Sequence, residues 1–235
     1  METLQHTYQV VQRGMENPPA KIGLLYGAHG VYQTATLLMA EVVKRNGTVA
    51  VVDGANRIDP YYLPKIAQLH ALNAEEFLQH AYVSRAFTFY QIDVSLTDGL
   101  LEFMQSINSK VLLVYGLLDL IDDEQVAIPD IHDILQRITV MFAQLKAKGI
   151  SILLVSTPLR FELYEREKYF SELEKMSDIV YRLDHHHQNY FTITIEEGEN
   201  HGTLNPHSNN DHRSGKSTLV ELPTGAQKRG TRYAR

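Results

Sequence analysis

The first residues whose types and spacing could do chemistry are Gly27 to Thr34, which read GAHGVYQT. In a phosphate-binding loop, glycines let backbone N–H groups surround the anion, a lysine neutralises the outer phosphates, and a Ser or Thr hydroxyl holds magnesium. Gly27 and Thr34 stand at the two ends of that spacing, but Tyr32 replaces the second glycine and Gln33 replaces the lysine. The segment therefore has the frame of an anion-binding loop without its cation.

Two other residues of this loop and one acid beyond it could still contribute. Gly30 allows a tight turn, and the helix expected behind the loop favours an anion at its N-terminus. His29 could donate a hydrogen bond to a phosphate or pack against an aromatic neighbour, and Asp53 ends the next apolar run. The alternative is a plain strand-to-helix connection. The candidate nucleotide-binding residues are Gly27, His29, Gly30, Gln33, Thr34 and Asp53.

The elements that must position these residues follow from the hydrophobic pattern. Apolar runs predict strands at residues 22–26, 48–53, 82–87, 111–115 and 150–156, and a hairpin at residues 178–184 and 190–197. Amphipathic stretches predict helices at residues 34–46, 61–72, 74–80, 94–107 and 130–148. This alternation predicts an α/β fold with a mostly parallel sheet covered on both faces, extended by an antiparallel hairpin. In such sheets ligands bind beyond the carboxyl ends of the strands.

Composition narrows the class of protein. The chain has 235 residues, 44% of them hydrophobic and 21% charged, which is ordinary globular usage. It has no cysteine, which excludes disulfides and thiolate metal sites. No apolar run approaches the roughly 20 residues that span a bilayer. The N-terminus has no apolar signal-peptide core, so we expect a cytoplasmic protein without membrane partners.

The charge is divided unevenly along the chain. We expect an N-terminal segment at residues 1–20, a core domain at residues 21–200 and a disordered, basic tail at residues 201–235. Six basic and two acidic side chains give residues 203–235 a charge of +4, which leaves −10 for residues 1–202 of the total −6. Such a tail can bind nucleic acid or an acidic partner, or it can be a solvated terminus. Its basic residues are Arg213, Lys216, Lys228, Arg229, Arg232 and Arg235.

A second candidate for nucleic-acid binding follows the strand at residues 150–156. The segment PLRFELYEREKYF places Arg160, Arg166 and Lys168 among aromatic residues, and aromatic rings can stack on bases while cations follow the phosphate backbone. Three glutamates in the same segment nearly cancel these cations. A surface amphipathic helix, used as a protein interface, accounts for the pattern equally well.

The ordered set of motifs resembles the RecA/recombinase ATPase superfamily between Ile22 and about Glu199. VAVVDGANRIDPYYLPKIA is similar to the second strand of that family and its following loop, and VSRAFTFYQ to the strand after it. VLLVYGLLDLI occupies the place of the family's Walker B strand, SILLVSTP is similar to its strand before the second DNA-binding loop, and SDIVYRLDHHHQNYFTITIEE is similar to its closing hairpin. The resemblance implies a RecA-like fold over about three quarters of the chain.

The same resemblance places the chemical groups of the family at residues that lack them. The catalytic glutamate falls at Ala55, the Walker B aspartate at Tyr115 and the Walker A lysine at Gln33. Phosphoryl transfer depends on such charges and on the metal, so we expect no catalytic residue and no metal site. We expect no cofactor, with ATP and magnesium as the alternative. The run His185-His186-His187 is interpreted as a solvated turn, because neighbouring strand residues face opposite sides.

The resemblance and these replacements together predict a RecA-like protein without ATPase chemistry. It would act as a non-catalytic binding or regulatory subunit in DNA recombination or repair, as a homo-oligomer or with a partner ATPase of the RecA family, and could contact DNA through the basic tail. One alternative is an ATPase with an atypical Walker A loop, in which Thr34 and either Asp53 or Asp119 hold the metal and a cation enters the pocket from elsewhere. A second alternative is a protein-interaction scaffold that binds neither nucleotide nor DNA.

Overall fold

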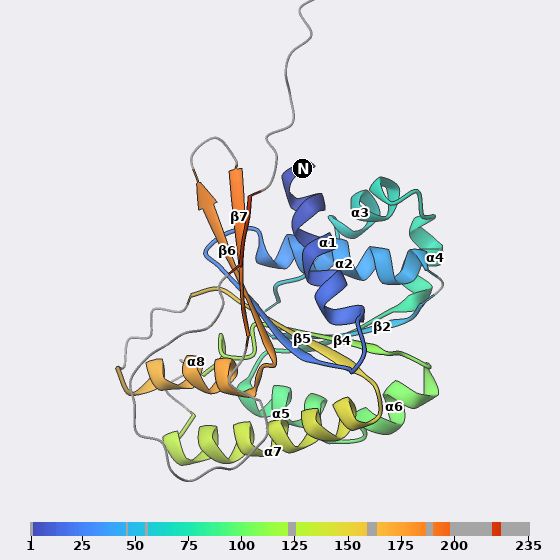
Figure 1. The fold of residues 1–235 in the computed structure, drawn as a ribbon. Helices are drawn as coiled ribbons and strands as arrows, with labels where there is room; N and C mark the ends of the chain where they lie inside the picture. Colours follow the sequence, from blue (N-terminus) through green and yellow to red (C-terminus); the bar gives the residue numbers. More distant parts are fainter. Residues whose placement is uncertain are drawn as a thin grey trace, which may run out of the picture.

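The computed structural model describes residues 2–45, 47–54, 56–121, 126–158, 164–186, 190–197 and 218–221, and these form three layers. A twisted sheet lies between two sets of helices (Figure 1). One face carries α1 (Glu2–Glu16), α2 (Val31–Lys44), α3 (Leu63–Leu69) and α4 (Ala74–His80). The other face carries α5 (Phe89–Thr97), α6 (Leu100–Ser106), α7 (Ile128–Ala147) and α8 (Tyr164–Met176).

The strand order is β3-β2-β4-β5-β1-β6-β7-β8, and every pair from β3 to β6 is parallel. β6, β7 and β8 pair in the antiparallel sense, which confirms the predicted fold class of a mostly parallel α/β sheet with an antiparallel hairpin. The bounds are β1 (Ile22–Tyr26), β2 (Val49–Gly54), β3 (Ala81–Ala86), β4 (Val111–Tyr115), β5 (Ser151–Ser156), β6 (Ile179–His186), β7 (Tyr190–Glu197) and β8 (Thr218–Glu221).

The connections leave β1 in two directions. The chain passes from β1 through α2 to β2, which lies beyond β5 and β4, and it later returns from β5 through α8 to β6 on the other side of β1. α2 and α8 lie on opposite faces of the sheet (Figure 1). This reversal makes the carboxyl end of β1 a topological switch point, where a crevice is expected.

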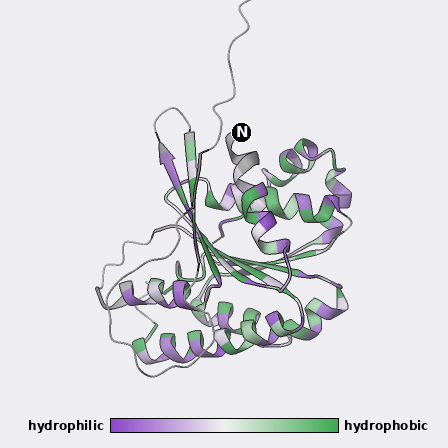
Figure 2. Cartoon of the chain, in the orientation of Figure 1, coloured by the Kyte–Doolittle hydropathy of each residue, from purple (hydrophilic) through white to green (hydrophobic). Residues whose placement is uncertain are grey.

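Alternation along the central strands divides the core in two. Leu24 and Leu112 face the cluster under α5–α8, whereas their neighbours Leu25 and Leu113 face the cluster under α1–α4. Figure 2 shows the strands as largely hydrophobic between helices that mix both colours. No helix in the described part of the chain is long and apolar enough to cross a bilayer.

Several elements differ from the sequence-based expectations. The helix predicted at residues 94–107 is two helices, α5 and α6, with a turn at Asp98 and Gly99. The N-terminal segment, for which no element was predicted, contains α1, whose Tyr8 and Val11 are buried in the core. The tail was expected to be disordered, but residues 218–221 form β8 because their backbone pairs with β7.

The strand expected at residues 82–87 is present as β3, but it is not buried. It ends the sheet and pairs only with β2 among the described residues, so one edge of its backbone has no strand beside it. The side chains from Tyr82 to Arg85 are exposed. β3 therefore differs from β2, β4 and β5, in which nearly every side chain is buried.

Candidate functional site at the carboxyl ends of the strands

The first loop lies at the switch point, and two of its glycines are required there. Gly30 has φ 81° and is the residue before α2, in the left-handed region that favours glycine. Gly27 lies against β6, where a Cβ atom would come within 2.2 Å of the Leu183 carbonyl oxygen. The loop is thus packed between the start of α2 and the backbone of β6. Gly30, the N-cap residue of α2, has no side chain that could cap the helix.

The other predicted loop residues point in different directions. Gln33 is exposed, whereas Thr34 is fully buried and its hydroxyl oxygen has no hydrogen-bond partner among the described residues. His29 is exposed and packs against His185 of β6 with ring centroids 5.4 Å apart, and His185 in turn packs on Phe191. The position of the missing lysine therefore presents an amide to solvent, and His29 has the aromatic neighbour that was one of its two expected roles.

Asp53, the predicted acid after β2, holds the loop that follows it. Its Oδ1 accepts a hydrogen bond from the Arg57 backbone N–H at 2.6 Å, and its Oδ2 accepts one from the Ile58 N–H at 3.0 Å. Arg85 of β3 approaches the same Oδ2 with its Nε at 3.8 Å. Asp53 is completely buried. Both carboxylate oxygens are used by the protein itself, which leaves this acid in a structural role.

Three further side chains meet above the strand ends, and we name Tyr32, Arg57 and Asp119 the crevice triad. The Arg57 Nε donates to Asp119 Oδ2 at 2.6 Å, and a second guanidinium nitrogen also pairs with that oxygen. The Arg57 guanidinium lies over the Tyr32 ring, 5.5 Å from its centroid, and the Tyr32 hydroxyl is 3.5 Å from Asp119 Oδ2. The triad joins α2, the loop after β2 and the turn after β4.

Tyr115, which the sequence resemblance matched to a metal-binding aspartate, is part of the core. It is completely buried, its ring lies 5.6 Å from that of Tyr32, and its hydroxyl is 3.5 Å from the Thr36 hydroxyl. Burial raises the pKa of Tyr115, so its phenol stays protonated and neutral. The phenol therefore supplies packing volume where a carboxylate would have supplied a metal ligand.

The electrostatics of the crevice are set by internal pairs. Burial raises the pKa of the Asp119 carboxyl above its ordinary value, against the opposing influence of the Arg57 guanidinium. Burial also raises the pKa of Tyr32, to which the nearby Asp119 carboxylate adds. Two arginines at this end of the sheet, Arg57 and Arg85, are paired with carboxylates.

These pairs bear on whether a magnesium–nucleotide could be held here. Such a ligand needs a cation for its outer phosphates and a carboxylate for its metal. Arg57, which could bind a phosphate, is paired with Asp119, which could bind the metal. Both carboxylate oxygens of Asp53 accept hydrogen bonds from backbone N–H groups. The residues present therefore do not fit a magnesium–triphosphate in the described arrangement. Among the described residues, no group of three His, Asp or Glu side chains could hold a metal ion.

Several predicted positions lie elsewhere. Ala55 lies outside the described residues, as do Arg160, Arg213, Lys216, Lys228, Arg229, Arg232 and Arg235. Arg166 belongs to α8, but only its backbone is described. Lys168 of α8 is exposed, with its Nζ 5.1 Å from the centroid of the Tyr169 ring. Of the residues predicted to bind nucleic acid, Lys168 is therefore the one whose side chain the structure describes.

Sequence reasoning missed Arg57, Arg85 and the role of Tyr32. Arg57 and Asp119 are separated by 62 positions, so no local spacing connects them. A signal was present, because Arg57 follows a strand whose carboxyl end faces the first loop, and a cation there can reach it. Tyr32 was treated as a missing glycine, whereas its ring is the surface on which Arg57 lies.

A second feature lies at the β3 edge of the sheet. A groove of about 460 Å³ runs between β2, β3 and the α5–α6 turn, and apolar side chains make up most of its lining. Tyr82, Val94 and Phe103 line it and are 41%, 58% and 40% exposed, and the rings of Tyr82 and Phe103 pack with centroids 5.7 Å apart. Asp98 is the one charged residue among those that line it. We name this surface the β3-edge groove.

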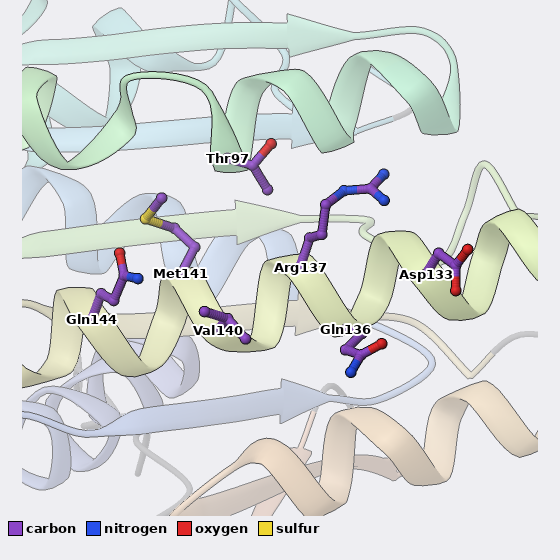
Figure 3. Close-up of a pocket in the computed structure, with 7 residues that line it drawn as sticks. All are labelled: Thr97, Asp133, Gln136, Arg137, Val140, Met141 and Gln144. Carbon is purple, nitrogen blue, oxygen red and sulfur yellow. The ribbon is translucent and has the colours of Figure 1, made fainter.

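Another cavity, of about 370 Å³, lies over the outer side of α7 next to Thr97 (Figure 3). Its cation, Arg137, extends toward α5 and pairs with Asp93 at 2.5 Å. The remaining lining is two apolar and several polar side chains, without an unpaired buried group. This cavity is a surface depression between α5 and α7, and it does not join the crevice triad.

The comparisons with known proteins do not assign this chain to a family. No protein-family model matches this sequence, and no curated protein matches it. The functional argument therefore depends on the crevice, on the β3-edge groove and on the motifs of the sequence.

Proposed function

We propose that this protein is a RecA-like protein without ATPase chemistry, which acts as a binding or regulatory subunit in DNA recombination or repair. The observation that carries the proposal is the crevice triad. Where an active loop would hold phosphates, Arg57 is paired with Asp119 over the ring of Tyr32, and Gln33 is turned to solvent. Removing single electrostatic contacts from an active site typically costs about 3–4 kcal/mol of transition-state stabilisation, and here several are replaced.

The β3-edge groove supports the binding role. A strand edge without a neighbour is a template for another strand, and proteins that do not use such edges usually protect them with charge, proline or a covering element. β3 has no proline, and apolar side chains are exposed beside it, including Tyr82 and Val83. A second copy of this chain, or a partner of the RecA family, could add a strand there by backbone hydrogen bonding.

One observation favours the ATPase alternative. That alternative requires a cation to enter the pocket from outside the first loop, and Arg57 does so from the loop after β2. Its guanidinium is paired in the described arrangement, so it would have to exchange Asp119 for a phosphate before it could act. This requirement makes Arg57 the residue that separates the two functions.

The test is magnesium-dependent ATP turnover by purified full-length protein, compared with Gln33→Ala and Arg57→Ala. Our proposal predicts that the wild type and both variants release phosphate at the rate of the buffer alone. Turnover by the wild type that is lost in Arg57→Ala would establish the ATPase alternative instead. Turnover lost in Gln33→Ala would show that the amide at the lysine position takes part.

The DNA part of the proposal has its own test. Replacing the six basic residues of 203–235 with glutamine removes their charges but keeps β8, so binding to single-stranded DNA and its salt dependence should both weaken. Wild type and this variant are compared by fluorescence anisotropy at 50 and 200 mM salt. Equal affinities would remove the tail from the DNA-binding role, and absence of binding in both would favour the pure protein-interaction scaffold.

A further inference from the structure

Arg57 and Asp119 are unequally placed in the crevice triad. The Asp119 side chain is 2% exposed, whereas that of Arg57 is 39% exposed, so the carboxylate lies inside and the guanidinium lies at the mouth. A solute that approaches the crevice meets Arg57 first. The guanidinium has five N–H donors in a planar fork that suits oxyanions, and the described bonds to Asp119 use part of that set.

Asp119, the partner of Arg57, has one carboxylate oxygen without a hydrogen bond among the described residues. Its Oδ2 accepts from Arg57 and lies near the Tyr32 hydroxyl, but its buried Oδ1 has no hydrogen-bond partner among the described residues. A buried ion pair gains little net stability unless every lone pair is satisfied, because desolvation offsets the attraction. An external anion that took Arg57 from a charged Asp119 would leave this carboxylate buried without a partner, which is costly, so the pair keeps such an anion out until the charge of Asp119 is removed.

The neighbouring helix end supplies a second unsatisfied group. α2 has 14 residues, begins after Gly30 without a side-chain cap, and by its dipole favours an anion at that end. Thr34, in its first turn, carries a fully buried hydroxyl without a partner among the described residues. Tyr32, in the same turn, connects this helix end to Arg57 and Asp119 through its ring and its hydroxyl.

We propose that Asp119 is an internal anion that occupies Arg57 and keeps closed a site for a phosphate-class oxyanion, formed by Arg57 and the first turn of α2. The inference rests on the proposed non-catalytic function and adds a regulated ligand to it. In the closed state the Asp119 carboxylate takes the place of the ligand. Displacing it from Arg57 exchanges one oxyanion for another, with no covalent step.

The direct test is Asp119→Asn, which keeps the side-chain shape and removes the internal charge. Inorganic pyrophosphate is titrated at pH 7.5 and melting temperatures are measured. We expect no shift for the wild type and a saturable rise of roughly 3–10 °C for Asp119→Asn, since a ligand that binds only the folded state stabilises it. Adding Arg57→Ala to Asp119→Asn should abolish the rise. A folded Asp119→Asn protein without any rise would overturn the proposal.

Asp93→Asn is the matched control, because it removes the carboxylate of another Asp–Arg pair, with Arg137, at a distance from the crevice. It should respond to pyrophosphate as the wild type does. An equal rise in both variants would mean that loss of any negative charge is sufficient, and would also overturn the proposal.

A measurement on unaltered Asp119 covers the case in which Asp119→Asn fails to fold. Acidification protonates Asp119, whose charged neighbours are Arg57 and Asp53, with the neutral Tyr32 phenol alongside. Inorganic sulfate, which keeps its charge over this range, should then raise the melting temperature of the wild type more as the pH is lowered from 7.5 toward the ordinary pKa of an aspartate. Arg57→Gln should lack this increase, and an identical increase in that variant would contradict the proposal. ATP turnover by the wild type would refute the proposed function while leaving these anion-binding results to be judged separately.

Discussion

The crevice and the β3-edge groove differ in whether the groups that could bind a ligand already have partners within the protein. At the crevice, polar groups that could bind a ligand bind one another, as in the pairing of Arg57 with Asp119 and of Asp53 with two backbone N–H groups. At the groove, a strand edge and several apolar side chains have no described covering element. The crevice contains charged groups that are paired with one another, whereas the groove contains mostly apolar groups that are exposed.

This difference indicates what kind of ligand each region suits. Closed ion pairs discourage small anionic ligands unless a pair is broken, since the ligand must replace an existing interaction. An open strand edge with apolar neighbours suits another polypeptide, which supplies both backbone hydrogen bonds and side chains. As described, the groove therefore suits a polypeptide better than the crevice suits a nucleotide.

The largest expected effect tests whether Tyr115 is a core residue rather than a ligand position. Tyr115→Ala should lower the free energy of unfolding by about 3–5 kcal/mol, because it removes a fully buried aromatic ring and leaves a cavity. Urea denaturation provides the measurement. Tyr115→Phe keeps the ring and should lose no more than about 1.5 kcal/mol, the value of one hydrogen bond. Equal losses in both variants would point to the phenol, and not the ring, as the important group.

Asp53 should give the next largest effect if its role is structural. Asp53→Ala leaves the backbone N–H groups of Arg57 and Ile58 without their acceptor, which should cost about 2–3 kcal/mol in denaturant titration. Asp59→Ala is the control, since Asp59 accepts one exposed N–H bond, from Tyr61, and its loss should cost less than about 1 kcal/mol. An Asp53→Ala protein as stable as the wild type would free this acid for a chemical role.

The pH dependence of stability tests how completely the crevice is satisfied. The pKa of Asp119 is raised in the folded protein, so the stability that this group contributes is complete below its ordinary pKa of 3.8 and is lost as the pH rises through the folded value. Relative to Asp119→Asn, which does not titrate, the wild type should therefore lose stability as the pH rises from 3.8 through the raised pKa of the folded protein. Urea denaturation across this range measures the difference. Parallel profiles would show that Asp119 is fully compensated.

The smallest effect on stability is expected at the β3 edge. Val83→Lys should change the free energy of unfolding by less than about 0.5 kcal/mol, since the side chain is exposed, but the charge should block strand addition. Sedimentation velocity should show weaker self-association, or weaker binding of a partner, than in the wild type. Val140→Lys, at an exposed valine of α7, is the control and should associate normally. Equal association by both variants would contradict the prediction that the β3 edge is an association surface.

The sequence allowed the fold to be predicted further than the site. The central strands are continuous apolar runs, and such runs need helices on both faces, so the three-layer arrangement followed from pattern alone. β3 was predicted as a strand, but its exposure depends on its position at the end of the strand order, which local residues do not specify. α1 was not predicted, because the burial of its apolar residues depends on packing against α2, which the local sequence does not specify.

The limits were stricter for the site. Gly27 and Gly30 were correctly predicted to lie in the loop between the first strand and the next helix, because a strand-to-helix turn has local spacing rules. The pairing of Arg57 with Asp119 depends on the parallel neighbours β2 and β4, and the orientation of Tyr32 depends on both partners. Contacts between residues far apart in the chain produce no periodic pattern in the sequence, so the crevice triad could be identified only from the structure.

The most direct test of the closed crevice is the melting temperature of the wild-type protein with 1 mM ATP and magnesium. A ligand bound with a Kd of 10 μM would stabilise the folded state by about 2.7 kcal/mol and raise the melting temperature by roughly 5–10 °C. The account predicts a change of less than about 1 °C, the same as with magnesium alone. A saturable rise of several degrees that requires ATP would show that the crevice is open, and would contradict the account.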